Sequence, residues 1–266
     1  MRRRRDLRRA PLANAVILAL AAIAAGCGPD LKVGSDVLWS ATFETGSFSE
    51  WTDLGRGAEA FPESGDSIAV SREHAHDGNY AAKLIIDTSI AGEQQNTLLS
   101  RVGDLPVEGY YSAWYYLPSA VTVGTYWVIF KFRLRTNAAD ESTTTEFYDL
   151  DLVNRSPGQM SLVLYDHSPT GHEIPLDMPH PSVPVGTWFQ IESFYRNAQD
   201  NTGRLTFWLD EHQIIDINGQ PMAPTSWIEW EVCSIGEDLT PSPAVLYIDD
   251  TALSVTRVGP TGRITN

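Results

Sequence analysis

The most strongly patterned segment of the chain is residues 186–216, GTWFQIESFYRNAQDNTGRLTFWLDEHQIID, where a turn joins two alternating runs. Phe189 and Ile191 fall on one side of the first run, and Leu205 and Phe207 fall on one side of the second. A period of two residues is typical of a strand with one buried face. The segment therefore predicts a long β-hairpin with an apolar inner face and a polar outer face.

Similar strand-like runs occur along most of the chain, at residues 36–43, 67–73, 81–87, 96–102, 110–117, 127–135, 146–154, 160–165, 227–235 and 245–255. Turn-rich segments separate these runs, and no amphipathic helix of any length is predicted. We therefore expect residues 37–258 to form one all-β domain, an antiparallel β-sandwich.

The first 26 residues have the pattern of an export signal, with the basic stretch RRRRDLRR followed by an uncharged, alanine-rich run. This run is shorter than the ~20 residues that span a bilayer. The small residues directly before Cys27 resemble the bacterial lipoprotein box, which implies cleavage before Cys27 and acylation of its thiol. We expect a signal peptide at 1–26, a lipidated tether at 27–36, the sandwich at 37–258 and a C-terminal tail at 259–266, in a protein anchored to the bacterial cell envelope.

Charge and cysteine content restrict the partners and the means of stabilisation. Removal of residues 1–26 takes away six arginines and one aspartate and changes the formal net charge from −15 to −20. This charge argues against nucleic acid as a partner and against contact with an anionic membrane other than through the lipid anchor. After acylation of Cys27 the one remaining thiol is Cys233, so no disulfide framework can form. We expect a monomer held together by its core or by a metal ion.

Five segments in order along the chain resemble the concanavalin A-like jelly rolls: WSATFETGSFSEW (39–51), HAHDGNYAAKLII (74–86), YYSAWYYLP (110–118), residues 186–210, and VLYIDDTALSV (245–255). In pattern they are most similar to the heparinase-like polysaccharide lyases and to related carbohydrate-binding and laminin-G-type sandwiches. The resemblance implies a jelly-roll fold and a polysaccharide partner. It does not choose an activity, because such sandwiches include lyases, hydrolases and lectins.

The resemblance also implies a structural calcium ion. In several carbohydrate-binding sandwiches an N-terminal Phe-Glu-x-Gly segment meets an Asp-Asp pair on the last strand, and their oxygens hold Ca²⁺. The corresponding residues are FETG at 43–46, with Glu44, and the pair Asp249 and Asp250. Calcium takes six to eight oxygen ligands, so such a site would join the two ends of the domain. The alternative is a set of solvated acids at strand ends.

Alternation predicts which polar side chains point outward. If the strands at 127–165 lie beside the hairpin, one concave face carries both sets, and we expect it to bind a saccharide. The expected members of this face are Trp127, Lys131, Arg133, Asp149, Asp151, Tyr165, Gln190, Glu192, Arg196, Arg204 and Trp208.

A polysaccharide lyase neutralises the carboxylate of a uronic acid and removes the neighbouring proton. Lys131, Arg133 or Arg196 offers the neutralising cation, and Tyr165 or Lys131 offers the base if its pKa is lowered. His167 or His172 is a further acid or base if the loop that carries them folds over the sheet.

Other uses of the same face stay open. Asp149 and Asp151 lie ~7 Å apart along a strand, as a glycosidase would need, but the Glu-x-Asp-x-x-Glu motif of laminarinase-type sandwiches is missing. Trp127 and Trp208 can stack on sugars without catalysis. The favoured hypothesis is an envelope-anchored, lyase-like protein that interacts with polysaccharide. Its alternatives are a non-catalytic carbohydrate-binding module and a structural envelope lipoprotein.

Overall fold

The structure is a computed structural model that describes residues 36–51, 57–60, 65–102, 105–137, 140, 143–167, 171–222 and 227–261. Contacts divide the chain into residues 1–32 and 33–266, and the described residues all belong to the second unit. The predicted signal peptide, Cys27 and residues 27–35 of the predicted tether lie outside the described residues, as do residues 262–266 of the predicted tail. Among the described residues, no helix has the length and apolarity needed to cross a membrane.

Two antiparallel sheets make up the described part of the fold, which confirms the predicted all-β sandwich. The first, sheet I, has eight strands within the described residues. Its order is β13 (His212–Asn218), β12 (Arg204–Leu209), β11 (Trp188–Arg196), β6 (Glu108–Tyr116), β15 (Ala244–Ser254), β4 (Ala81–Ile86) and β3 (Ser67–Ser71), and β1 (Val37–Ala41) also pairs with β15.

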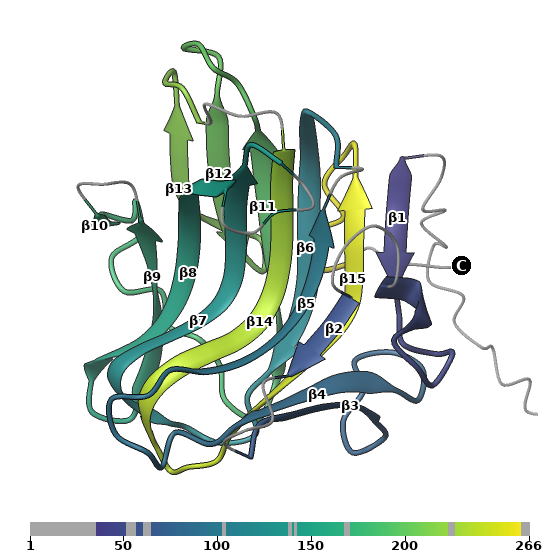
Figure 1. Ribbon diagram of the computed structural model, residues 1–266, viewed down its shortest axis with the longest axis vertical. Helices are drawn as coiled ribbons and strands as arrows, with labels where there is room; N and C mark the ends of the chain where they lie inside the picture. Colours follow the sequence, from purple (N-terminus) through teal and green to yellow (C-terminus); the bar gives the residue numbers. More distant parts are fainter. Residues whose placement is uncertain are drawn as a thin grey trace, which may run out of the picture. The chain divides into compact units, whose positions relative to one another are not determined.

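The second sheet, sheet II, has seven strands within the described residues. Its order is β10 (His172–Ile174), β9 (Gln159–Asp166), β8 (Thr144–Ser156), β7 (Thr122–Arg135), β14 (Trp227–Thr240), β5 (Gln95–Val102) and β2 (Gly57–Ala60). Figure 1 shows β8, β7 and β14 side by side and bending together. One short 3₁₀ helix, η1 (Ser49–Trp51), follows β1.

The inner faces of both sheets form one core. The apolar side chains that alternate along the strands point into it. The hairpin is formed by β11 and β12, which pair antiparallel, with Ser193 opposite Phe207. Ile191, Leu205 and Phe207 are fully buried in this core, together with Leu150 of β8. The strands missed in the sequence are β2, β10 and β13, which are short or directly continue the hairpin, so alternation alone did not separate them.

The alternation fails at one point of β7, where a β-bulge occurs. Val128 pairs with Asp151 and Phe130 pairs with Leu150, so Ile129 and Phe130 together oppose one residue of β8. A bulge adds a residue to one strand and so reverses the phase of the side chains beyond it. The side chains of Ile129 and Phe130 are both in the core, whereas Val128 packs in a separate small cluster.

The bulge corrects the prediction for Trp127. Its side chain is fully buried in the core, and its Nε1 donates a hydrogen bond of 2.9 Å to Ser234 Oγ. The predicted outward position of Trp127 is wrong because the alternation was read through the bulge without a change of phase. Lys131 and Arg133 lie beyond the bulge and face outward, as predicted.

The prediction that the hairpin shares a face with the strands at 127–165 is also wrong. The hairpin lies in sheet I, whereas β7, β8 and β9 lie in sheet II. Both sheets turn their apolar faces toward the shared core, so their outer faces point in opposite directions. The predicted members that the structure thereby separates from Lys131 are Gln190, Glu192, Arg196, Arg204 and Trp208.

Candidate functional site

A cavity of about 750 Å³ lies on the outer face of sheet II. Four predicted site residues line it together: Lys131 from β7, Asp149 and Asp151 from β8, and Tyr165 from β9. Further lining residues are Gln94, Thr125, Tyr126, Val128, Val153, Arg155, Val163, His167, Gly171, Glu173 and Ile235. The strand registers set these residues in rows across the sheet, because Lys131 is opposite Asp149 and Asp149 is opposite Tyr165.

The centre of the cavity is a charged cluster built on Asp149. The Asp149 Oδ2 atom lies 3.4 Å from Lys131 Nζ and 3.0 Å from His167 Nε2. The Asp149 side chain is 3% exposed, so its charge interacts with both partners in an environment that holds little water. The carboxylate therefore fixes the lysine and the imidazole in position relative to each other.

Lys131 is held in its charged form. Burial opposes the charge of its ammonium, but the neighbouring carboxylates of Asp149 and Glu231 outweigh that effect and raise the pKa of Lys131. A lysine that is cationic at neutral pH suits the neutralising role that the sequence offered for Lys131. It does not suit the role of base, which needs a lowered pKa.

The Asp151 carboxyl, in contrast, is held in its uncharged form. Burial, and after it the charge of Asp149, raise the pKa of the Asp151 carboxyl to about 8. Its Oδ1 atom is buried and accepts no hydrogen bond from the described residues. At neutral pH this side chain is therefore mainly a neutral acid, which can donate a hydrogen bond to an anion.

Tyr165 and His167 complete the cluster. Their ring centroids are 4.6 Å apart, and the residues lie at the end of β9 and just after it. The sequence offered His167 or His172 for the site on the condition that their loop approached the sheet, and of these two His167 lines the cavity whereas His172 does not. The structure satisfies that condition because the register puts Tyr165 opposite Asp149, which brings the nearby His167 within reach of that carboxylate.

Arg133 points to the same outer face but does not line the cavity. Its Nη1 lies 3.4 Å from Glu231 Oε1 and 3.7 Å from Glu229 Oε2, both on β14. Arg135 pairs with Glu229 as well. Arg133 therefore belongs to an ion-pair network beside the cavity, and the structure does not place it with Lys131 and Tyr165.

The polar outer face of the hairpin is largely covered by the chain's own residues 257–259. Glu192 is fully buried and accepts hydrogen bonds from Arg257 Nε at 2.8 Å and from Val258 N at 2.7 Å. Gln190 donates to the Gly259 carbonyl at 3.1 Å, and the Arg257 guanidinium lies 4.4 Å from the Trp208 ring centroid. These contacts account for Glu192, Gln190 and Trp208 as residues that hold the C-terminal segment.

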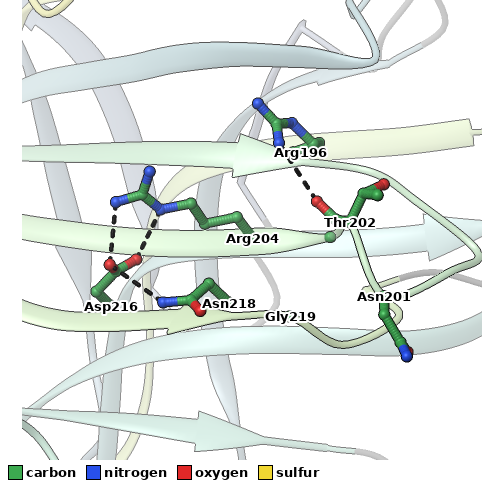
Figure 2. A pocket seen from close by; sticks show the side chains of 8 residues that line it. Arg196, Asn201, Thr202, Arg204, Asp216, Asn218 and Gly219 are labelled. Atoms are coloured by element: carbon green, nitrogen blue, oxygen red, sulfur yellow. Dashed lines mark hydrogen bonds and ion pairs between the residues drawn. The ribbon is translucent and has the colours of Figure 1, made fainter.

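A second pocket, of about 450 Å³, lies at the end of the hairpin (Figure 2). Arg204 forms two hydrogen bonds to Asp216, of 2.8 and 3.0 Å, and Arg196 pairs with Glu108 and with the Thr202 carbonyl. Both arginines are thus neutralised by their own carboxylates. The cavity of sheet II differs from this pocket because it also contains a buried oxygen, Asp151 Oδ1, that has no hydrogen-bond partner among the described residues.

The three predicted calcium ligands lie around the turn before β4. Glu44 accepts hydrogen bonds of 2.8 Å from the Asn79 and Tyr80 amides, and Asp249 Oδ2 accepts one of 2.8 Å from the His76 amide. Asp250 Oδ2 is 2.6 Å from His76 Nδ1. Within the described parts of the chain, no group of three or more His, Cys, Asp or Glu is placed to hold a metal ion.

The donors around these carboxylates are N–H groups, which occupy positions that a cation would need. Gly78 has a φ of 67°, and a Cβ there would lie 2.4 Å from the Glu44 carboxylate, so the turn is built tightly on Glu44. Ca²⁺ could therefore bind these carboxylates only if the turn rearranged and the N–H donors moved away from them.

Comparisons with known proteins agree with the fold. The sequence matches no protein-family model, and a comparison with curated proteins gives no match. Solved structures do match. An endo-β-1,4-glucuronan lyase from the fungus Trichoderma reesei aligns with a TM-score of 0.63 at 13% identity, over 85% of this chain and 100% of that one.

Two alginate lyases are similar to a comparable degree. The enzyme from a Chlorella virus has a TM-score of 0.56 at 12% identity, covering 83% of this chain and 100% of its own. Alginate lyase Aly36B has a TM-score of 0.55 at 11% identity, covering 82% of this chain and 97% of its own. Identities this low show the fold alone. The chain has the jelly-roll sandwich fold of polysaccharide lyases, as its sequence resemblance implied.

The protonation state of Asp151 can be tested through the pH dependence of the free energy of unfolding. Its carboxyl keeps a proton in the folded protein that the unfolded chain releases above about pH 4, so this group lowers the free energy of unfolding as pH rises toward about 8. The slope is at most about 1.4 kcal/mol per pH unit. Asp151→Asn cannot ionise, so it removes this decrease in the free energy of unfolding. We expect the variant to gain stability relative to the parent between about pH 4 and 8, and the difference to be level above that range.

Urea unfolding across this pH range measures the difference, and Asp177→Asn, at an exposed aspartate, controls for the loss of one charge. A difference between Asp151→Asn and parent that does not change with pH would show that Asp151 is ionised in the folded protein.

Proposed function

We propose that this protein is a polysaccharide lyase that cleaves a uronate-containing glycan by β-elimination in the cavity of sheet II. The observation that carries the proposal is the convergence of Lys131, Asp149, Tyr165 and His167 in one cavity, on the fold of polysaccharide lyases. These four residues supply the charges and proton carriers that the reaction needs. One chain contributes all of them, so a monomer suffices for activity.

The substrate carboxylate binds to Lys131. Its ammonium neutralises that carboxylate, which makes the neighbouring C5 proton of the uronate more acidic. Asp151, as a neutral acid, donates a hydrogen bond to the same carboxylate. Both contacts become stronger as negative charge moves onto the carboxylate in the transition state, so they accelerate the reaction rather than only improve binding.

His167 removes the C5 proton in this proposal. When its Nε2 donates to Asp149, the neutral imidazole keeps a lone pair on Nδ1 to accept that proton. The electron pair of the C5–H bond forms the C4=C5 double bond, and the C4–O4 bond breaks. Tyr165 protonates the leaving O4 oxygen, so protons and electrons balance without a further reagent.

Variants of the two proton carriers test the proposal. Tyr165→Phe and His167→Gln keep the size of each side chain approximately but remove the proton transfer, so we expect kcat to fall by about 10²–10⁴ with little change in glycan affinity. The measurement is the ultraviolet absorbance of the unsaturated product in full-length protein, together with affinity-gel retardation for binding.

His172→Gln is the matched control, because His172 is exposed on the neighbouring β10 and does not line the cavity. Product formation that persists at the parent rate in both Tyr165→Phe and His167→Gln would contradict the assigned chemistry. If the parent retards on glycan gels and releases no unsaturated product, the protein is a carbohydrate-binding module instead.

We propose calcium as a stabilising ion at Glu44, Asp249 and Asp250, in a rearranged form of this turn. Burial, and then the charge of the adjacent Asp250, raise the pKa of Asp249. A bound cation would reduce the repulsion between these two carboxylates. We expect the parent protein to have a higher melting temperature in calcium than in chelator. In Glu44→Gln this difference between the two conditions should disappear. Identical melting curves in both conditions would remove calcium from the proposal.

We also propose that Cys27 is acylated and anchors the protein to the bacterial envelope. Support comes from the basic N-terminal stretch, the uncharged run and the small residues before Cys27. In a bacterial host, the parent is expected to partition into the detergent phase of a Triton X-114 extract and Cys27→Ala into the aqueous phase. Parent protein found in the aqueous phase would argue against the anchor.

A further inference from the structure

The cavity of sheet II has little positive charge that is not already paired with an acid, so it is not suited to a glycan with a carboxylate on every sugar. Two cations line it, Lys131 and Arg155, together with the carboxylates of Asp149 and Glu173 and the neutral acid Asp151. Arg155 pairs with Glu173, and Lys131 lies 3.4 Å from Asp149. Each cation is therefore already compensated by an acid of the site, and the formal charge of residues 27–266 is strongly negative. A polyanion would approach against this field.

The row of residues next to Lys131 is mostly aliphatic. Ile235 of β14 pairs with Val128 of β7, Val128 pairs with Asp151 of β8, and Asp151 pairs with Val163 of β9. All four of these residues line the cavity. A sugar unit bound beside the one held by Lys131 would therefore contact three aliphatic side chains and one buried carboxyl.

This row fits an uncharged sugar. Val128, Val163 and Ile235 are 3%, 7% and 4% exposed, and the C–H face of a neutral sugar ring can pack on the parts that face the cavity, which present no cation. The Oδ1 atom of Asp151 is buried and accepts no hydrogen bond from the described residues, and a sugar hydroxyl would supply the missing donor. A second carboxylate in this position would find no cation in the row itself, and Arg155 elsewhere in the cavity is already paired with Glu173.

Two further lining residues are also uncharged. Tyr126 of β7 and Val153 of β8 line the cavity beyond Val128 and Asp151. The Tyr126 hydroxyl donates a hydrogen bond of 2.9 Å to Gln94 Oε1, which also lines the cavity, and this bond helps to fix the position of the ring. An aromatic ring and an amide are suited to stacking and hydrogen bonding with a neutral sugar.

We infer that the substrate is a heteropolysaccharide in which each uronate is flanked by an uncharged sugar, and not a polyuronate. The inference rests on the proposed lyase function, and it names the substrate class of the same site. Lys131 binds the carboxylate of one uronate, and the aliphatic row beside it contacts the uncharged neighbouring sugar.

The test compares two pairs of glycans with the full-length protein. Hyaluronan and gellan carry uronates separated by uncharged sugars, whereas alginate and glucuronan are polyuronates. We expect kcat/KM, measured by product absorbance at equal uronate concentration, to be at least about 10-fold higher for the first pair. The preference should shrink as salt is added, because part of it is electrostatic.

Two variants separate the charge contribution from general damage to the fold. Glu173→Gln removes an acid that lines the cavity and should narrow the preference, chiefly by raising kcat/KM on the polyuronates. Glu108→Gln is the matched control, because Glu108 also pairs with an arginine at a partly exposed site but lies on sheet I. It should leave the preference unchanged.

The outcomes distinguish this inference from the proposed function. Equal or higher kcat/KM on alginate or glucuronan would overturn the inference and leave the lyase intact. If no glycan releases product, the lyase proposal fails, and affinity-gel retardation with the same four glycans then decides the inference: retardation by the polyuronates alone would overturn it, and stronger retardation by hyaluronan or gellan would support it.

Discussion

The site depends on the constraint that both sheets bury their inner faces in one core. Each strand then has a single outer face, and only residues of the same sheet can meet there. In sheet II this constraint brings Lys131, Asp149 and Tyr165 into one row, because β7, β8 and β9 are neighbours with a fixed register. The bulge at Ile129 preserves the arrangement, since it changes the phase of β7 before Lys131 and not after it.

Charges that are taken out of water need compensation, and the cavity shows how it is arranged. Asp149 serves two cationic or hydrogen-bonding partners, Lys131 and His167, at 3.4 and 3.0 Å. Asp151 avoids a second buried negative charge by keeping its proton to about pH 8. One cation, one anion and one neutral acid therefore lie close together. An arrangement of this kind is preorganised, because the protein does not need to reorient these groups when charge moves during a reaction.

Much of the fold follows from the sequence pattern. The period of two residues predicted the strands of the hairpin and the inner faces of β8 and β9, because alternation is decided locally by each strand's own residues. The same reasoning failed for Trp127, since a bulge is a pairing feature that no single strand reveals. It also failed for Glu192, because the segment that covers it, residues 257–259, is distant in the chain.

The sequence by itself determined the all-β class and the outward direction of Lys131, Asp149, Asp151 and Tyr165, because these depend on side-chain alternation within a strand. Only the tertiary structure decided which outward faces meet. Strand order depends on contacts between distant segments, so the insertion of β14 between β7 and β5 sets Ile235 beside Val128. The same order sets the hairpin on the other sheet, away from Lys131. The hairpin therefore helps to build the core, and the chemistry lies on the strands that share a sheet with Lys131.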